Sequence, residues 1–322
     1  MATINFGDKN YAVASLNVSS DVIKFGDGHH DRLLLNGDNN TVTFGNGNQD
    51  AVTVTGTFND ITLGNGDRDA VATVGGSFNH ITLGDGNQDM ASVSGGFHNV
   101  VTLGDGDQDS ARVNGGPDTT IRLGNGAGDT ATVAGNEENV YVGNGDGDTV
   151  TVSAMNTFIY AGNGPGDTLN ISGDLDTVFG GQGNTINFVN GGGVGILNLQ
   201  GNDRPRVFMG PDTHVYLNGC NTPTVFIGSG SSASVFDQST GMHLNIGPTI
   251  GSVVLGDFGQ DLAHGVIDLI GGIGGFTTTG AVLAALTPDG SGGTRLSFGP
   301  GSSLDIQGVL PSALTAANFK IG

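Results

Sequence analysis

Apolar and polar residues alternate in short runs along most of the chain. Before each of a series of glycines, apolar side chains stand three positions and one position upstream, as Ile61 and Leu63 do before Gly64. A second alternating run follows the next turn, as in Val52 and Val54. Because an alternation with a period of two gives a strand one buried face, this pattern predicts two short β-strands in every repeat.

The alternation belongs to an internal repeat. The glycines that close the first run lie 19 or 20 residues apart, at Gly7, Gly26, Gly45, Gly64, Gly84, Gly104, Gly124, Gly143 and Gly162. A unit of this length leaves no room for a crossover helix, so we expect each unit to form one coil of the chain that stacks on the next coil. We therefore expect an all-β fold, a parallel β-solenoid of the β-roll or β-helix kind, with coils about 4.8 Å apart. One extra residue in the run at 69–74 predicts a β-bulge, and the turn glycines are expected to supply positive φ angles.

The repeat divides the chain into three parts. Residues 1–190 are expected to form a regular solenoid with acidic, Gly-rich turns, and residues 191–257 a series of divergent coils. Residues 258–322 are expected to form a C-terminal cap region. The strand-like runs of the divergent part lie at 196–199, 207–209, 215–217, 225–227, 234–236, 244–246 and 253–255.

Composition and charge narrow the classes of partner. Glycine accounts for 60 of the 322 residues and Trp is absent, so a thick hydrophobic core is excluded and order must come from the repeat. Lys and Arg number 10 against 31 Asp and Glu, a net charge of −21, which argues against nucleic acid and anionic membranes as partners. No apolar run approaches the length of a membrane span, no N-terminal signal peptide is recognisable, and the single Cys220 excludes an internal disulfide.

Each marker glycine from Gly26 onward opens a six-residue turn that ends in aspartate, for example GNGDRD at 64–69. The closing residues are Asp31, Asp50, Asp69, Asp89, Asp109, Asp129, Asp148 and Asp167. The second position is always Asn or Asp, and the aspartates there include Asp27, Asp85 and Asp105. Stacked coils would place these oxygens in two columns along one edge of the solenoid.

Two carboxylates one coil apart repel by roughly 3 to 4 kcal/mol at an effective dielectric constant near 20. Hard oxygen ligands on adaptable turns suit Ca²⁺ better than Zn²⁺ or Mg²⁺. We therefore expect these eleven aspartates to hold a ladder of Ca²⁺ ions between successive turns. The alternative is that each aspartate accepts backbone N–H bonds of its own turn and stays solvated without metal.

The opposite turn of the coil carries Asn59, Asn79 and Asn99 in place of aspartate. These residues predict an asparagine ladder, hydrogen-bonded from coil to coil with no metal.

The acidic turns resemble the GGxGxDxUx nonapeptide of the repeats-in-toxin (RTX), hemolysin-type calcium-binding proteins, which form a calcium-bound parallel β-roll. In that family the Asp lies two residues after the last Gly, whereas in GNGDRD it lies three after, and each coil here has one such turn. The stretch nearest the family motif, GGQGNT at 180–185, has Thr185 at the Asp position. The resemblance implies a calcium-dependent fold.

Residues 257–322 resemble the C-terminal flank of type I-secreted RTX proteins. The matching segments are VIDL at 266–269, AVLAAL at 281–286, GGTRLSF at 292–298, SLDIQGV at 303–309 and ALTAANF at 313–319. This resemblance implies an uncleaved C-terminal export signal, an extracellular or cell-surface location, and folding that waits for extracellular calcium. The same segment is also expected to act as a plain cap.

No catalytic residues are predicted, and we do not expect an enzyme, because the chain lacks GxSxG, HExxH and any paired Cys and His. The fold class resembles that of polysaccharide lyases and epimerases, so a polysaccharide-binding or polysaccharide-modifying solenoid is the alternative. The arginines that such a site would use are Arg68, Arg112, Arg122, Arg204 and Arg206, which form no obvious groove. An outward column of Thr43, Thr62, Thr82 and Thr102 would suit ice binding, but Lys24, Arg122, Tyr141 and Tyr160 interrupt it.

The repeat is already in phase at Ile4 and Phe6, so we expect the edge of the first coil to be uncovered and able to pair with another chain. The sequence thus predicts a secreted, calcium-stabilised structural protein of the cell surface or extracellular matrix that self-assembles into a homo-oligomer or polymer. Polysaccharide is the second candidate partner.

Overall fold

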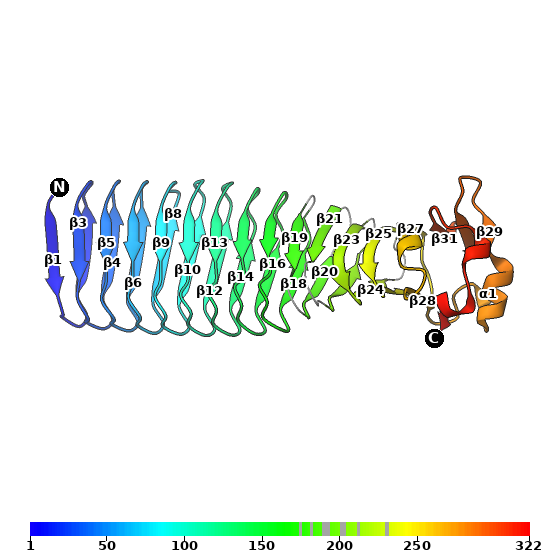
Figure 1. The fold of residues 1–322 in the computed structure, drawn as a ribbon. Coiled ribbons are helices and arrows are strands. Elements are labelled where there is room, and N and C mark those ends of the chain that lie inside the picture. Colours follow the sequence, from blue (N-terminus) through cyan, green and yellow to red (C-terminus); the bar gives the residue numbers. More distant parts are fainter. Residues whose placement is uncertain (174–175, 181–182, 189–193, 200–203, 211–212, 229–231) are drawn as a thin grey trace. The chain divides into compact units, whose positions relative to one another are not determined.

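The chain folds as a parallel β-solenoid, which confirms the predicted fold class (Figure 1). The computed structural model describes residues 1–173, 176–180, 183–188, 194–199, 204–210, 213–228 and 232–322. The chain divides into two compact units, an N-terminal unit, Met1–Asp167, and a C-terminal unit, Thr168–Gly322.

In the N-terminal unit each coil contributes one strand to each of two parallel sheets, and the blue to green strands of Figure 1 show these coils in a regular row. Sheet A contains β1 (Thr3–Gly7), β3 (Val22–Phe25), β5 (Thr41–Thr43), β7 (Asp60–Thr62), β9 (His80–Thr82), β11 (Val100–Thr102), β13 (Thr120–Arg122), β15 (Asn139–Tyr141) and β17 (Phe158–Tyr160). Sheet B contains β2 (Val13–Asn17), β4 (Arg32–Asn36), β6 (Ala51–Thr55), β8 (Ala70–Val74), β10 (Met90–Ser94), β12 (Ser110–Asn114), β14 (Thr130–Val133) and β16 (Thr149–Val152).

Equivalent residues of successive coils stack directly on one another. Ile81 of β9 pairs with Ile61 of β7 and Val101 of β11, and all three side chains are buried. The core between the sheets is therefore built from columns of similar apolar side chains, as the alternation predicts. Aromatic rings follow the same rule, since Phe25 and Phe44 stack with their ring centroids 4.2 Å apart.

Close stacking explains the second glycine of each acidic turn. The backbone of Gly86 lies so near the preceding coil that a Cβ atom there would overlap the carbonyl oxygen of Gly66. The same overlap recurs at this turn position in the other coils, at Gly28, Gly47, Gly66, Gly106, Gly126, Gly145 and Gly164. These glycines have no positive φ, so for this turn position the expectation of left-handed torsions is wrong, and close approach is the reason for them. Other turn glycines, such as Gly75 and Gly128, do have the expected positive φ.

The predicted bulge at 69–74 is also wrong. Strand β8 pairs residue for residue with β6 and β10, with no shift of register. Gly76 stacks on Gly56, whereas a Cβ at Gly75 would meet nothing within 4 Å. The extra residue of this coil is therefore Gly75, and the open turn absorbs it without disturbing the sheet.

The C-terminal unit repeats the two-sheet arrangement with less regular turns. One sheet contains β18 (Thr168–Ile171), β20 (Thr185–Phe188), β22 (Arg206–Met209), β24 (Thr224–Ile227), β26 (His243–Ile246), β28 (Val266–Leu269) and β32 (Phe319–Ile321). The other contains β19 (Thr177–Gly180), β21 (Val194–Leu199), β23 (Thr213–Asn221), β25 (Ala233–Thr240), β27 (Ser252–Gly256), β29 (Thr287–Pro288), β30 (Thr294–Gly299) and β31 (Ser302–Ile306). All seven strand-like runs predicted between 196 and 255 are strands, whereas the predicted boundary near 190 and part of GGQGNT lie outside the described residues.

Parallel pairing continues past residue 257, where the sequence indicated its end. Strand β28 pairs with β26, β31 with β27, and β32 with β28, all in parallel. The rest of this segment contains helix α1 (Thr279–Ala285), the short helices η1 (Phe258–Gln260), η2 (Ile273–Gly275), η3 (Pro311–Ala313) and η4 (Ala316–Asn318), and the antiparallel pairs β29–β30 and β30–β31. The C-terminal segment thus contributes strands to the solenoid as well as helices.

We expect Gly86→Ala to lower the free energy of unfolding by about 3 kcal/mol, because the new methyl group must push two coils apart. Gly75→Asn is the matched control, since position 75 is open and asparagine tolerates its φ of 71°. Urea unfolding followed by circular dichroism measures both variants, and equal stability of the two would contradict the stacking argument.

Candidate functional site

Some side chains of the acidic turn are buried inside the coil and others are exposed to solvent. In the turn at 84–89, Asp85 is exposed and Asp89 is buried. Gln88 has a left-handed φ of 63° and redirects the chain so that the next side chain points into the coil. The same conformation recurs at His30, Gln49, Arg68 and Gln108.

The eight closing aspartates form one buried column, each at most 1% exposed. From Asp31 to Asp148, the backbone N–H of each aspartate donates to Oδ1 of the aspartate one coil further on, over 2.8 to 3.1 Å, and Asp167 is the last acceptor. The structure therefore brings together Asp31, Asp50, Asp69, Asp89, Asp109, Asp129, Asp148 and Asp167. The predicted alternative, a solvated aspartate bonded within its own turn, differs from this arrangement, because the bond crosses to the neighbouring coil.

The second oxygen of every carboxyl in this column, Oδ2, is buried without a hydrogen-bond partner. A buried oxygen that carries charge and lacks a partner is costly, so each carboxyl needs a proton or a cation at neutral pH.

Burial shifts the pKa of the column upward. Loss of solvation raises the pKa of Asp50 to about 6 and those of Asp69, Asp89, Asp109, Asp129 and Asp167 to about 7. The neighbouring carboxyl adds to the increase for Asp89, and the backbone N–H bond opposes it. Desolvation also raises the pKa values of Asp31 and Asp148. Six of the eight carboxyls, Asp50, Asp69, Asp89, Asp109, Asp129 and Asp167, consequently gain and lose protons near neutrality.

The aspartates at the second turn position lie in a separate, exposed column. Asp105 N–H donates to Asp85 Oδ1 over 3.0 Å, and Asn46 N–H donates to Asp27 Oδ1 over 2.8 Å. These bonds run toward the preceding coil, opposite to those of the buried column. Asp27, Asp85 and Asp105 therefore do not share a site with the buried carboxyls.

The predicted asparagine ladder of the opposite turn is confirmed. Asn59 N–H donates to Asn79 Oδ1 over 2.9 Å, and Asn79 Nδ2 donates to the Gly56 carbonyl over 3.0 Å. Each buried amide thus satisfies a donor and an acceptor on different coils. The column continues to Glu138, whose Oε2 accepts a bond from Thr119 N–H and whose pKa burial raises to about 8. Glu138 was not among the predicted site residues, although its distance from Asn99, two coils of 19 to 20 residues, places it in register.

A related carboxyl cluster in the C-terminal unit was also overlooked. GDFGQD at 256–261 keeps the hexad pattern but has the buried Phe258 in place of the second glycine. Buried Asp261 accepts bonds from the N–H groups of Gly241 and Met242, each over 2.8 Å. Nearby Asp237 has an unpartnered Oδ2, and burial raises its pKa, with Asp261 adding to the increase.

The buried column meets part of what Ca²⁺ requires. Calcium takes six to eight oxygen ligands, and each coil offers one unpartnered carboxyl oxygen. Among the described residues, no group of three or more His, Cys, Asp or Glu side chains is placed to hold a metal ion. An ion at the column would therefore use Oδ2 atoms of these aspartates together with backbone carbonyls of the turns or water.

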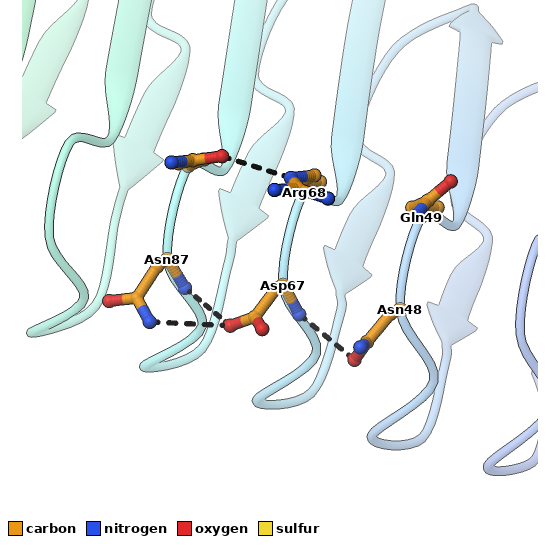
Figure 2. Close-up of a pocket in the computed structure, with 6 residues that line it drawn as sticks. Asn48, Gln49, Asp67, Arg68 and Asn87 are labelled. Atoms are coloured by element: carbon orange, nitrogen blue, oxygen red, sulfur yellow. Dashed lines mark hydrogen bonds between the residues drawn. The ribbon is translucent and has the colours of Figure 1, made fainter.

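The outer side of the acidic turns forms a shallow polar hollow of about 210 Å³. Figure 2 shows Asn48, Asp67 and Asn87 in one row, with Gln49 and Arg68 in a second row beside it. Asp67 Oδ1 accepts the Asn87 N–H over 2.9 Å, and Arg68 Nε donates to the Gln88 side chain over 2.9 Å. The hollow offers amide, guanidinium and carboxylate groups to solvent at regular intervals.

The remaining sequence candidates lie elsewhere. Arg112 is on the outer face of sheet B, and Arg122 on that of sheet A lies 5.0 Å from the Tyr141 ring centroid. In the C-terminal unit, Arg206 stacks near the ring of Phe226. The threonine column at 43, 62, 82 and 102 lies in register on the outer face of sheet A.

No known protein family, characterised protein or solved structure matches this chain at a significant level. The resemblance to RTX proteins consequently rests on the turn and C-terminal sequences alone. No helix in the described parts of the chain has the length and apolar character needed to cross a bilayer.

The raised pKa values predict a fold that is destabilised as the pH rises. The unfolded carboxyls release their protons near pH 4, whereas five of the folded ones, Asp89 among them, hold theirs until about pH 7. The folded state thus binds more protons between these values, so the melting temperature in EDTA should fall from pH 5 to pH 8.

Asp89→Asn should raise the melting temperature at pH 8 relative to the native chain and weaken the pH dependence, because the amide cannot ionise. Asp85→Asn, on the exposed side of the same turn, is the control and should follow the native profile. Calorimetry at several pH values measures this, and a melting temperature that rises with pH would contradict protonation of the column.

Proposed function

We propose that this chain is a secreted, calcium-stabilised structural protein of the cell surface or extracellular matrix that assembles with copies of itself. The observation that carries the proposal is the buried column of eight carboxyls, each with an unpartnered Oδ2. Because these carboxyls must be neutralised, the stability of the fold would depend on the pH and on the cations in solution.

Protons and calcium are the two neutralising species that the column allows. Protons suffice below about pH 7, where the pKa of Asp89 and most of its neighbours lies. At higher pH the carboxyls ionise, and a divalent cation would then replace the proton and cancel the repulsion between coils. Bound Ca²⁺ would supply charge neutralisation and cross-linking between coils.

Several features support an extracellular structural role. The likeness of residues 257–322 to the flank of type I-secreted proteins implies export, and extracellular fluid supplies calcium. The solenoid offers long, regular surfaces, and its net charge of −21 requires counter-ions. A structural role would use these regular surfaces for contacts and would need no catalytic residues.

Calcium at millimolar concentration should raise the melting temperature of the native chain at pH 8 by several degrees, and the gain should be smaller at pH 5, where protons occupy the column. Asp89→Asn should reduce the calcium-dependent gain because one carboxylate is lost, whereas Asp85→Asn should retain it. Calorimetric titration into chelator-treated protein measures the binding.

The absence of both binding heat and a shift in melting temperature at pH 8 would refute the calcium role. If Asp89→Asn is more stable than the native chain both with and without calcium, protons alone neutralise the column.

Polysaccharide binding is a second candidate, favoured by the hollow of Figure 2. Planar amide and guanidinium groups in regular rows can hydrogen-bond the hydroxyl groups of a sugar chain. Arg68→Ser together with Gln49→Ala should weaken retardation of the protein in gels that contain a neutral polysaccharide. Arg112→Ser with Thr53→Ala, on sheet B, is the control, and equal mobility of the two double variants in these gels would reject the hollow as the site.

A further inference from the structure

The outer face of sheet B in the N-terminal unit carries few charged side chains. Its outward residues on the five strands from β2 to β10 are Val13, Ser15, Asn17, Arg32, Leu34, Asn36, Ala51, Thr53, Thr55, Ala70, Ala72, Val74, Met90, Ser92 and Ser94. No Asp or Glu stands among them, although the chain carries 31 acidic residues. Arg32 is the one charged side chain in this set.

This face exposes large apolar side chains. Val13 is 73% exposed, Leu34 50%, Val74 49% and Met90 54%. Strand propensity accounts for a shortage of aspartate on a sheet, but it does not require exposed Leu and Met. The outer face of sheet A, built by the same repeat, carries Asp60 and His80 at positions equivalent to each other. Exposed apolar groups gathered on one acid-free face indicate a contact surface.

The apolar face is also hollowed. A depression of about 390 Å³ lies over β2, β4 and β6, where Val13, Leu34, Ala51 and Thr53 line it. Beyond it, β8 presents the small side chains of Ala70 and Ala72 on the outer face.

We propose that sheet B of the N-terminal unit is the interface between two copies of this chain, packed face to face about a two-fold axis that runs along β6. Such an axis exchanges β2 with β10 and β4 with β8. Val13 then faces Met90 of the second copy, and Leu34 faces Ala72 of the second copy. Leu34 thus meets a small side chain, and the flexible Met90 enters the depression beside Val13.

The size and charge of the face suit a weakly associating second copy. The five strands that overlap about this axis, about 4.8 Å apart and about 17 Å long, give a face of roughly 400 Å², so two copies would bury about 800 Å², the size of a weak, transient interface. Since the acidic residues of this unit lie mainly in the turns, two highly acidic molecules can meet here without placing carboxylates in contact.

This interface specifies how copies of the chain would assemble in the proposed structural role. It rests on the proposed function only for the expectation that copies associate. The interface involves neither calcium nor the buried column. Its experiments are therefore run in EDTA and repeated in calcium, so that a failure of the interface can be distinguished from a failure of calcium to stabilise the fold.

Thr53 lies on the proposed axis, so Thr53→Cys should place two thiols opposite each other across the interface. A short bismaleimide should link this variant into covalent dimers. Thr62→Cys, on the outer face of sheet A, is the matched control and should stay monomeric on denaturing gels. The native Cys220 is buried and provides the background.

Leu34→Asp should raise the dimer dissociation constant about tenfold or more in sedimentation equilibrium, because it puts a charge against Ala72 of the second copy. Thr62→Asp should leave the constant unchanged, and circular dichroism verifies that both variants fold. A native chain that stays monomeric at high concentration, equal effects of the two Asp variants, or equal cross-linking of the two Cys variants would overturn the interface. Dimers that form equally in EDTA and in calcium would support it even if calcium fails to stabilise the fold.

Discussion

Close stacking of successive coils is the constraint on which the other features of this solenoid depend. The second glycine of each acidic turn has no room for a Cβ beside the carbonyl of the coil before it. At this separation the coils stay in register, and every position of the repeat becomes a column of equivalent side chains. The apolar core, the asparagine ladder and the carboxyl column are all consequences of that stacking.

The two turns of each coil solve the same hydrogen-bonding problem with different chemistry. Asn79 satisfies a donor and an acceptor at once, so its column is complete without a ligand. Asp89 has the same acceptor function but leaves Oδ2 unpartnered. The asparagines of one edge therefore need neither a proton nor an ion, whereas each aspartate of the other edge needs a proton or a cation to neutralise it at neutral pH. We attribute the environmental sensitivity of the proposed structural protein to this difference.

The sequence was sufficient to predict the solenoid, its strands and the asparagine ladder, because an alternation repeated every 19 or 20 residues leaves few other folds. It could not show that Asp85 and Asp89 lie on opposite sides of the turn, since that depends on the left-handed backbone of Gln88. It also missed Glu138, which continues the asparagine column with a different side chain. Column position, more than residue type, decides which polar groups become buried.

The hydrogen bonds of the acidic turns run in two directions along the solenoid. N–H groups of the inner column point toward the following coil, as from Asp89 to Asp109, while those of the outer column point back, as from Asp105 to Asp85. Their dipoles oppose one another, so this edge does not build up the terminal partial charges that an α-helix accumulates. However many coils the solenoid has, the dipoles of these two columns consequently stay opposed.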